Sequence, residues 1–297
     1  MATLLRHEGL DLPESLLFGL GGGLSFIYWD ARAMAFPFLG GRVKPFELTR
    51  NLTARLGLDL RVEETTSPRR AWRNVADVVD SGRPVGLQLD SFHLEYFQTK
   101  VHFGGHVVAM YGYDDNDVQL IDTVQQGGAV HTSRESLARA RAERGPMTAR
   151  NRSFTITVPP RSPRWQDQLV PAIRDCAEAF LAAPIANLGH RGIEKAAKKV
   201  PKWELSADDL STIALLMEKG GTGGALFRVL YRDFLGECAE LIDDAKLRAA
   251  HALYAEAATL WTCVSASIAA GNLDEAGAIL LSLSRIERNA MEALRRV

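Results

Sequence analysis

A histidine and an aspartate in the first half of the chain have the types and the spacing of an acid–base pair. His106 opens the apolar run HVVAMYGY, and Asp122 directly follows the next run, VQLI. The residues between the runs, Asp114 to Asp117, have a tight-turn composition that predicts a β-hairpin. In an antiparallel pair the start of one strand lies beside the end of its neighbour. We therefore expect Asp122 to orient the His106 imidazole, as in the base–orienter half of a nucleophilic triad. Spacing alone also allows a structural histidine beside a turn aspartate.

Other polar residues precede this hairpin. We expect Asp90, His93 and Tyr96 to line a substrate pocket, in which an acidic group would hold a cationic amine. His93, His102 and His106 with Asp90 are also residue types that bind zinc. However, Phe-Gly-Gly between His102 and His106 is poor helix material, so these two rings need not share a face. We predict no metal and no other cofactor.

Two glycine-rich stretches resemble phosphate loops at first sight. Residues 19–23 (GLGGG) lack a following Gly-Lys-Ser/Thr and a clear preceding strand, so both nucleotide fingerprints fail. We expect a tight loop where backbone approaches substrate or sheet, and assign Gly21 and Gly22, together with Tyr28, to substrate binding. Residues 220–224 (GGTGG) lie between two helical patterns and predict an interhelical turn.

The elements that must position these residues differ between the two halves of the chain. Short β-rich runs and helices that end at glycine alternate in the first half, which predicts strands at 84–89, 106–113, 118–121 and 154–158 and helices at 2–8, 46–56 and 71–80. Pro159 to Pro163 is a linker candidate. Beyond it, apolar spacing of three and four residues predicts an antiparallel helical bundle with helices at 206–219, 225–242, 246–270 and 273–297. We expect an α/β domain over residues 1–158 and an all-α domain over residues 164–297.

Length and composition agree with a two-domain globular protein. A chain of 297 residues suits two domains of roughly 150 residues. The formal net charge of −1 gives no whole-chain attraction for nucleic acid. No apolar run is as long as a membrane span, and Met1 does not open a signal peptide. Cys176, Cys238 and Cys263 form neither a disulfide framework nor a zinc cluster, and we expect all three to be buried as small hydrophobes. We predict a reduced, cytoplasmic protein that binds no membrane and no nucleic acid.

Several segments, in this order and spacing, resemble a known family. Residues 14–29, residues 82–85 with Asp90 and Tyr96, and the His106/Asp122 segment resemble the N-terminal domain of the butirosin biosynthesis protein H family. Residues 220–228, residues 231–235 and Trp261 resemble the helical domain that often follows it. The resemblance implies a papain-like (cysteine-peptidase-like) α+β fold for the first domain. It also implies an acyltransferase of specialised, antibiotic-like metabolism that passes an acyl group from a carrier-protein thioester to an amine, with His106 as base and Asp122 as its partner.

The resemblance further implies a nucleophilic cysteine just before the first helix. The chain begins at Met1 within that helix, so we expect the nucleophile to be missing, either because the start codon was assigned too late or because the protein lacks it. Ser25 does not replace it, because it lacks the G-x-S-x-G context. Three alternatives to the acyltransferase therefore stay open: a hydrolase of the same fold, an intramolecular cyclisation catalyst that uses His106 without a thiol, and a non-catalytic binding protein.

A basic run in the second half bears on the partners. Arg191, Lys195, Lys198, Lys199 and Lys202 fit either a solvated helix face or a dock for an acidic acyl-carrier protein. The expected partners are such a carrier or a small acyl thioester, together with a small-molecule amine. A homodimer is compatible with the sequence.

Overall fold

The computed structural model describes residues 1–31, 34–98, 100–145 and 148–297. The chain forms two compact units. Unit 1 consists of residues 1–13 and 44–163, and unit 2 consists of residues 14–43 and 164–297. The boundary at residue 163 lies at the predicted proline-rich linker. Residues 14–43 are a correction to the expected domain of residues 1–158, because they pack with the helices that follow the linker.

Unit 1 is built on an antiparallel sheet. Among the described residues its strand order is β3-β8-β4-β5-β6-β7. The strands are β3 (Asp59–Glu63), β4 (Val85–Leu89), β5 (His106–Tyr113), β6 (Asp117–Ile121), β7 (Ala129–Ser133) and β8 (Ser153–Thr157). The four strands predicted in this half correspond to β4, β5, β6 and β8. The edge strands β3 and β7 were missed because most of their side chains are exposed or half-buried, which leaves little apolar alternation to read.

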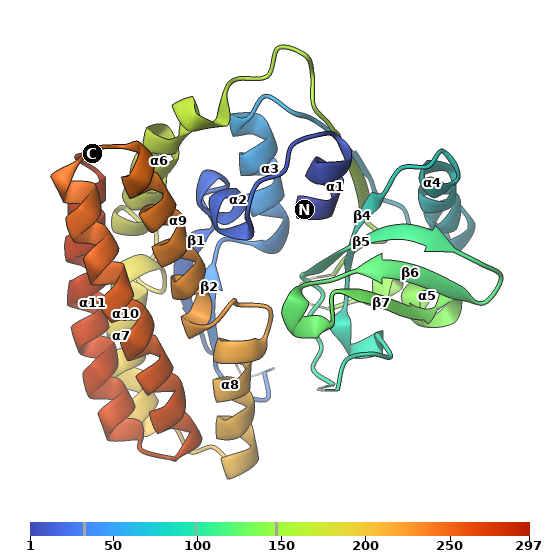
Figure 1. The fold of residues 1–297 in the computed structure, drawn as a ribbon. Coiled ribbons are helices and arrows are strands. Elements are labelled where there is room, and N and C mark those ends of the chain that lie inside the picture. The colour runs from blue at the N-terminus through green and yellow to red at the C-terminus, as the bar shows by residue number, and fades with distance from the viewer. Residues whose placement is uncertain (32–33, 99, 146–147) are drawn as a thin grey trace. The chain divides into compact units, whose positions relative to one another are not determined.

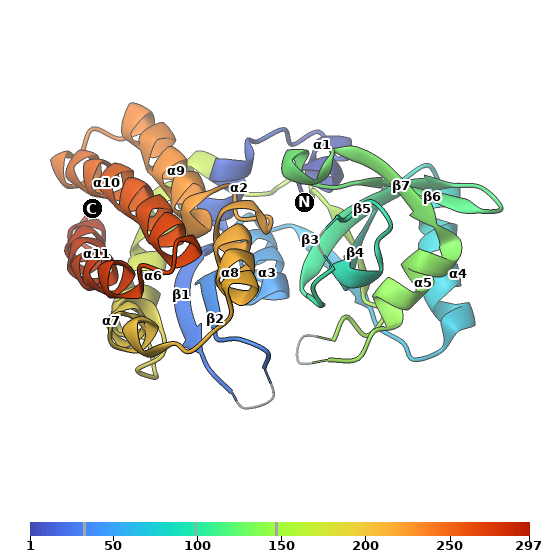
Figure 2. The same ribbon diagram turned by 90° about the horizontal axis from the view of Figure 1, so that it is seen from below.

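Helices cover both faces of this sheet. Figure 2 shows α4 (Pro68–Asp80) and α5 (Arg134–Ala142) beside it, and their buried residues Val75, Leu137 and Ala140 pack against Leu87 and Val108 of β4 and β5. α3 (Pro45–Arg55) packs on the opposite face, where the rings of Phe46 and Phe154 meet edge to face with centroids 5.3 Å apart. α1 (Ala2–His7) contacts β8. The loop between β4 and β5 is thus attached to a sheet that is packed on both faces.

Unit 2 combines a small hairpin with a helical bundle. α2 (Glu14–Leu20) leads into β1 (Leu24–Trp29), which pairs antiparallel with β2 (Phe38–Arg42). The long helices α9 (Arg228–Leu241), α10 (Ala245–Ala269) and α11 (Leu273–Leu294) lie side by side, and α10 also contacts α8 (Ala207–Lys219) (Figure 1). The remaining helices of the described chain are α6 (Leu169–Leu181), α7 (Gly189–Lys199) and the short 3-10 turns η1 (Ser91–His93), η2 (Val124–Gln126), η3 (Trp165–Gln168), η4 (Val200–Lys202) and η5 (Ala225–Phe227).

The segment of residues 14–43, which contains α2 and the β1–β2 hairpin, packs in the core of unit 2. Phe26 of β1 packs on Trp261 of α10 with ring centroids 5.5 Å apart. A Cβ added to Gly19 would lie 2.1 Å from the Phe234 ring, so only glycine fits at this crossing of α2 and α9. Residues 14–43 therefore belong with the bundle by close packing.

A buried ion pair joins the first residue of α9 to α11. Arg228 and Glu287 both have fully buried side chains, and the guanidinium donates two hydrogen bonds of 2.9 Å to the carboxylate. The indole of Trp261 donates to the same carboxylate at 2.5 Å. The helix predicted from residue 225 begins instead at Arg228, because Ala225, Leu226 and Phe227 have φ of 49°, 50° and 72°. Arg228 holds this left-handed turn through a 2.9 Å bond to the Leu226 carbonyl.

The three cysteines lie in unit 2. Cys176 and Cys238 are buried, as expected, and burial raises the pKa of the Cys238 thiol to about 12. Cys263 is exposed on α10, so the expectation that it is buried was wrong. No helix among the described residues is both long and apolar enough to span a membrane.

Candidate functional site

The predicted contact between His106 and Asp122 is present in unit 1. His106 pairs with Leu89 at the start of β5, and Ala109 pairs with Ile121 at the end of β6. Asp122 follows directly, so both side chains reach the same edge of the sheet. Nε2 of His106 lies 2.7 Å from Oδ2 of Asp122. The Asp122 side chain is fully buried and the imidazole is 12% exposed, which leaves the ring open to a substrate.

Asp122 is held as a carboxylate by several donors. Burial alone would raise its pKa, but the hydrogen bond and charge of His106, the amide of Thr123 and the hydroxyl of Tyr96 outweigh that effect. The pKa of Asp122 therefore lies below its ordinary value. The Thr123 amide donates to Oδ1 at 2.7 Å, and the Tyr96 hydroxyl donates to Oδ2 at 2.8 Å. A carboxylate fixed in this way can orient an imidazole and stabilise its protonated form.

Tyr96 acts on Asp122 as a neutral donor. Burial, together with the charge and hydrogen bond of Asp122, raises the pKa of Tyr96 well above its ordinary value. Tyr96 reaches Asp122 from the segment between β4 and β5, which is anchored to β7 and α5. Glu95 accepts hydrogen bonds from the Ser133 amide at 2.8 Å and the Ser133 hydroxyl at 2.8 Å. The hydroxyl of Ser136 donates to the His93 carbonyl at 2.6 Å.

The imidazole of His106 presents one free nitrogen. Its Nε2 is engaged with Asp122, and the ring of Phe97 packs edge to face against it with centroids 5.2 Å apart. Within the described residues, no hydrogen bond to His106 Nδ1 is present. A neutral His106 whose Nε2–H donates to Asp122 carries its lone pair on Nδ1. This nitrogen can accept a proton from a reacting group.

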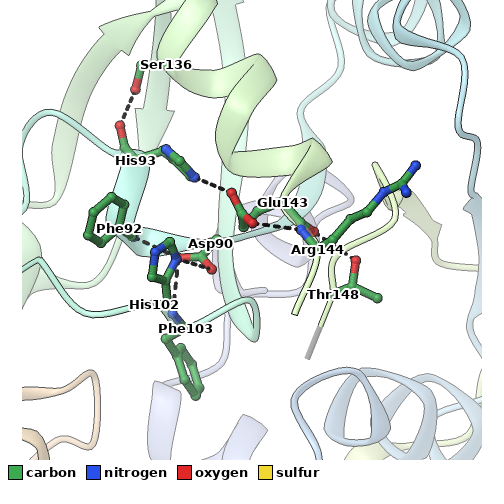
Figure 3. Close-up of polar contacts among 9 residues, drawn as sticks. All are labelled: Asp90, Phe92, His93, His102, Phe103, Ser136, Glu143, Arg144 and Thr148. Carbon is green, nitrogen blue, oxygen red and sulfur yellow. Dashed lines mark hydrogen bonds and ion pairs between the residues drawn. The ribbon is translucent and has the colours of Figure 1, made fainter. Parts of the chain in front are cut away.

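A second cluster of polar residues lies on the loop between β4 and β5 and at the end of α5 (Figure 3). His93 Nε2 is 2.6 Å from Glu143 Oε2, at the C-terminal end of α5. His102 Nδ1 is 3.3 Å from Oδ2 of Asp90, whose Oδ1 accepts from the amides of Phe92 at 2.9 Å and Phe103 at 3.1 Å. The hydrogen bonds from His93 and from the Arg144 amide hold the pKa of Glu143 below its ordinary value. Asp90 and His93 thus contact other protein groups, and a direct role of either in substrate binding stays a prediction.

The remaining predicted substrate-binding residues lie in unit 2. Gly21 and Gly22 form the turn after α2, where their amides donate to the carbonyls of Leu17 at 3.1 Å and Gly19 at 2.9 Å. Tyr28 is 1% exposed, and its hydroxyl contacts Trp203 and Asp30 at 3.3 Å each. These contacts give all three residues a structural role within unit 2, and their assignment to substrate binding stays a prediction.

The basic run lies on and just after α7. Lys195 donates to the Asn187 side chain at 2.7 Å, and Lys198 pairs with Glu194 at 2.7 Å. Arg191 donates to the Ala183 carbonyl. The side chains of Arg191, Lys198, Lys199 and Lys202 are exposed and that of Lys195 is half-buried. The run is therefore a largely solvated face, and docking of an acidic acyl-carrier protein on it stays a prediction.

Sequence reasoning missed two contributors to these two groups and the contact of a third. Tyr96 was expected to bind substrate, which stays a prediction, and its hydroxyl bonds Asp122. Phe97 and Glu143 were not singled out. Glu143 follows an arginine-rich stretch that gives no sign of its contact with His93, which is 50 residues earlier in the chain. The sequence signal that could have found Tyr96 and Phe97 is their place in the short segment between two core strands.

Comparison with protein families accounts for nearly the whole chain. Residues 1–123 match the family described as butirosin biosynthesis protein H, N-terminal. This match contains both His106 and Asp122. Residues 135–294 match a domain of unknown function, DUF4872. This second match covers Glu143, β8 and the helices α6 to α11 of unit 2. The comparison with curated proteins gave no match. The chain belongs to the DUF4872 family, whose model matches more than half of its length, and its first 123 residues match the N-terminal domain of butirosin biosynthesis protein H.

Proposed function

We propose that this protein transfers an acyl group from a thioester to an amine in specialised biosynthesis. The contact of His106 with the buried Asp122 carries the proposal, since it provides an oriented base with one free nitrogen. The family match supports a biosynthetic, acyltransferase-like role. Unit 1 also agrees with a papain-like fold, in which an antiparallel sheet brings a strand-opening histidine beside an acidic partner.

In the proposed reaction, His106 Nδ1 accepts a proton from the group that attacks the thioester carbonyl. For attack by the acceptor amine, the new C–N bond forms, the C–S bond breaks, and His106 returns the proton to the departing thiolate sulfur. The products are an amide and a free thiol. Asp122 stabilises the imidazolium that exists between the two proton transfers. The donor is a carrier-protein thioester or a small thioester, and no cofactor is consumed.

The three cysteines offer no suitable nucleophile for a covalent step. Cys176 and Cys238 are buried in unit 2, and the raised pKa of Cys238 keeps it a thiol. Cys263 is exposed, with no ion pair or hydrogen bond in the described structure. The proposal therefore assigns His106 to the proton transfer and does not assign a thiol of this chain to the attack.

Short acyl thioesters of N-acetylcysteamine, with a set of primary amines that includes an aminoglycoside, test the proposal. Mass spectrometry would detect the amide, and a thiol reagent would follow release of N-acetylcysteamine. We expect His106→Ala to lower kcat/KM by about 10²- to 10⁴-fold, the usual contribution of a general base. His131→Ala, at an exposed histidine of β7, serves as the matched control and should keep the wild-type rate.

Two outcomes would contradict the proposal. Amide formation that persists in His106→Ala would exclude this histidine as the base. Release of thiol with free acid as the sole acyl product, across all the amines, would identify a hydrolase. The mass of the protein during turnover adds a separate observation, because an acyl adduct would locate a covalent intermediate on a particular residue.

A further inference from the structure

Three side chains around the loop before β5 bring metal-binding atoms together. His93 ends η1, His102 lies in the loop before β5, and Glu143 follows α5. One ligand atom from each residue lies within 4.8 Å of the other two. Two imidazole nitrogens and one carboxylate oxygen are the ligand set of many catalytic zinc sites, in which water or substrate takes the fourth position. Figure 3 shows these residues around the end of α5.

Asp90 supports this cluster as an outer-shell partner would. Its side chain is 6% exposed, and Oδ2 lies 3.3 Å from His102 Nδ1. Oδ1 is fixed by two backbone amides, so the carboxylate has little freedom to turn away. A metal-binding histidine usually donates its second ring N–H to such a carboxylate, which sets the tautomer and leaves the other nitrogen free to coordinate. Asp90 also caps η1 through its bond from the Phe92 amide, and this cap fixes the carboxylate beside His102.

Aromatic packing fixes the orientation of the imidazole rings. The His102 ring stacks on Phe92 with centroids 4.0 Å apart and an angle of 12°. His93 meets the His102 ring at 69° with centroids 5.8 Å apart. The backbone of His93 is also held, through the hydrogen bond from Ser136 to its carbonyl. The rings are therefore ordered by groups other than Glu143.

We propose that His93, His102 and Glu143 form a zinc-binding site, with His102 coordinating through the nitrogen that faces away from Asp90. Zinc at about 2.0–2.1 Å from each ligand atom would hold these atoms about 3.3 Å apart in a tetrahedron. The 2.6 Å contact between His93 and Glu143 would open, and the widest pair would close from within 4.8 Å. His102 has a 57% exposed side chain and can make most of this adjustment.

This site is separate from the proposed acid–base pair and does not rest on the proposed function. His106 is not among the three residues whose ligand atoms come together there, and its Nε2 is engaged with Asp122. Bound zinc would link the loop that carries Tyr96 to the end of α5, and its fourth position would take water or an oxygen or nitrogen atom of a ligand. The match of the first family ends at residue 123, so it does not include Glu143.

Zinc titration of the full chain, freed of any affinity tag and treated with a chelator, tests the proposal. We expect one zinc ion per chain, measured by calorimetry, and a rise in Tm with added zinc. His102→Ala and Glu143→Gln should abolish this binding, and Asp90→Asn should weaken it by about 10- to 100-fold. His131→Ala should bind as wild type does. Co²⁺ in place of zinc should give the strong visible absorption of a four-coordinate site, and His102→Ala should lose it.

The variants also separate loss of binding from loss of fold. His102 is exposed and Glu143→Gln is nearly isosteric, so the circular dichroism spectra of both should equal that of the wild type. Equal zinc affinity in His102→Ala, Glu143→Gln and the wild type would overturn the proposal and identify binding elsewhere on the surface. Absence of zinc binding by a folded wild-type chain would overturn it as well, and would leave a His93–Glu143 ion pair.

Discussion

Asp122 connects the acid–base pair to the interior of unit 1. Its Oδ2 receives hydrogen bonds from His106 and Tyr96, while its Oδ1 receives the Thr123 amide. The carboxylate therefore has partners on both oxygens and is 0% exposed. Its effect on His106 depends on its staying ionised, which makes its donors part of the chemistry even where they touch no substrate.

Tyr96→Phe removes one of these donors with little change of shape. The pKa of Asp122 should rise, because its carboxylate loses a hydrogen bond, and protonation should begin at higher pH. We expect the acid limb of the pH–rate profile to shift upward. Hydrogen bonds to charged groups contribute about 1.5–3 kcal/mol, so kcat/KM should fall by roughly 10- to 150-fold if the whole contribution is lost. Tyr113→Phe is the control, since Tyr113 donates instead to Asp80 on α4. Unchanged profiles in both variants would exclude a positioning role for Tyr96.

The lowered pKa of Asp122 also predicts how stability changes with pH. A carboxyl group whose pKa is lower in the folded than in the unfolded state stabilises the fold above its unfolded pKa and loses this contribution on acidification. The difference in unfolding free energy between the wild type and Asp122→Asn should be constant above about pH 5 and shrink as pH falls below the ordinary value of 3.8. Urea denaturation at a series of pH values measures it. Asp115→Asn, at an exposed residue of the turn before β6, serves as the control variant.

At the scale of elements, the β5–β6 hairpin explains why the acid–base pair could be predicted. Its strands are apolar, its turn is rich in aspartate, and antiparallel register brings His106 to Asp122. Glu143 could not be found in this way, because its contact with His93 depends on how α5 packs on the sheet. The left-handed turn at Ala225–Phe227 was likewise hidden, since these residues ordinarily favour helix or strand. The long-range ion pair with Glu287 fixes the Arg228 guanidinium, which then donates to the Leu226 carbonyl and overrides that preference.

The Arg228–Glu287 pair gives a test of stability within the helical bundle. Replacement of Glu287 by Leu leaves a buried guanidinium without its carboxylate, and removal of one partner of a buried pair typically costs about 3–5 kcal/mol. The double variant Arg228→Met/Glu287→Leu should recover part of this loss, because neither charge is then buried. Chemical denaturation of both single variants and the double variant measures the coupling. Additive losses in the double variant would show that the two side chains do not depend on each other.

At the scale of the whole molecule, the two units are not two consecutive stretches of the chain, because residues 14–43 belong to unit 2. The proline-rich segment before residue 164 marks one boundary, and this much was readable from the sequence. The assignment of residues 14–43 to unit 2 could not be predicted from the sequence. It depends on contacts such as that of Phe26 with Trp261, which join residues more than two hundred positions apart. Local composition does not indicate which distant helix a strand will pack against.

A cut at this linker should therefore give fragments that do not fold alone. Residues 1–163 would keep α2, β1 and β2 without the helices that cover them, and residues 164–297 would lack Phe26 and Phe18 from their core. We expect each fragment to precipitate when expressed singly, and co-expression to restore a soluble complex. Size-exclusion chromatography with circular dichroism distinguishes these cases. A cooperatively folded monomer of residues 164–297 would contradict the expectation.

Because unit 2 combines an early and a late part of the chain, it cannot complete its fold until its last helices have been synthesised. β8 pairs with both β3 and β4, so the sheet of unit 1 is incomplete until residue 157 has been translated. Residues 14–43 leave the ribosome early, yet their partners α9 and α10 end at Leu241 and Ala269. At about 5–20 residues per second, the roughly 130 residues after the linker take on the order of 7–26 s. Until Phe227 and Trp261 have been translated, the rings of Phe18 and Phe26 lack the rings on which they pack, which makes this early apolar segment a part of the nascent chain that a chaperone would protect.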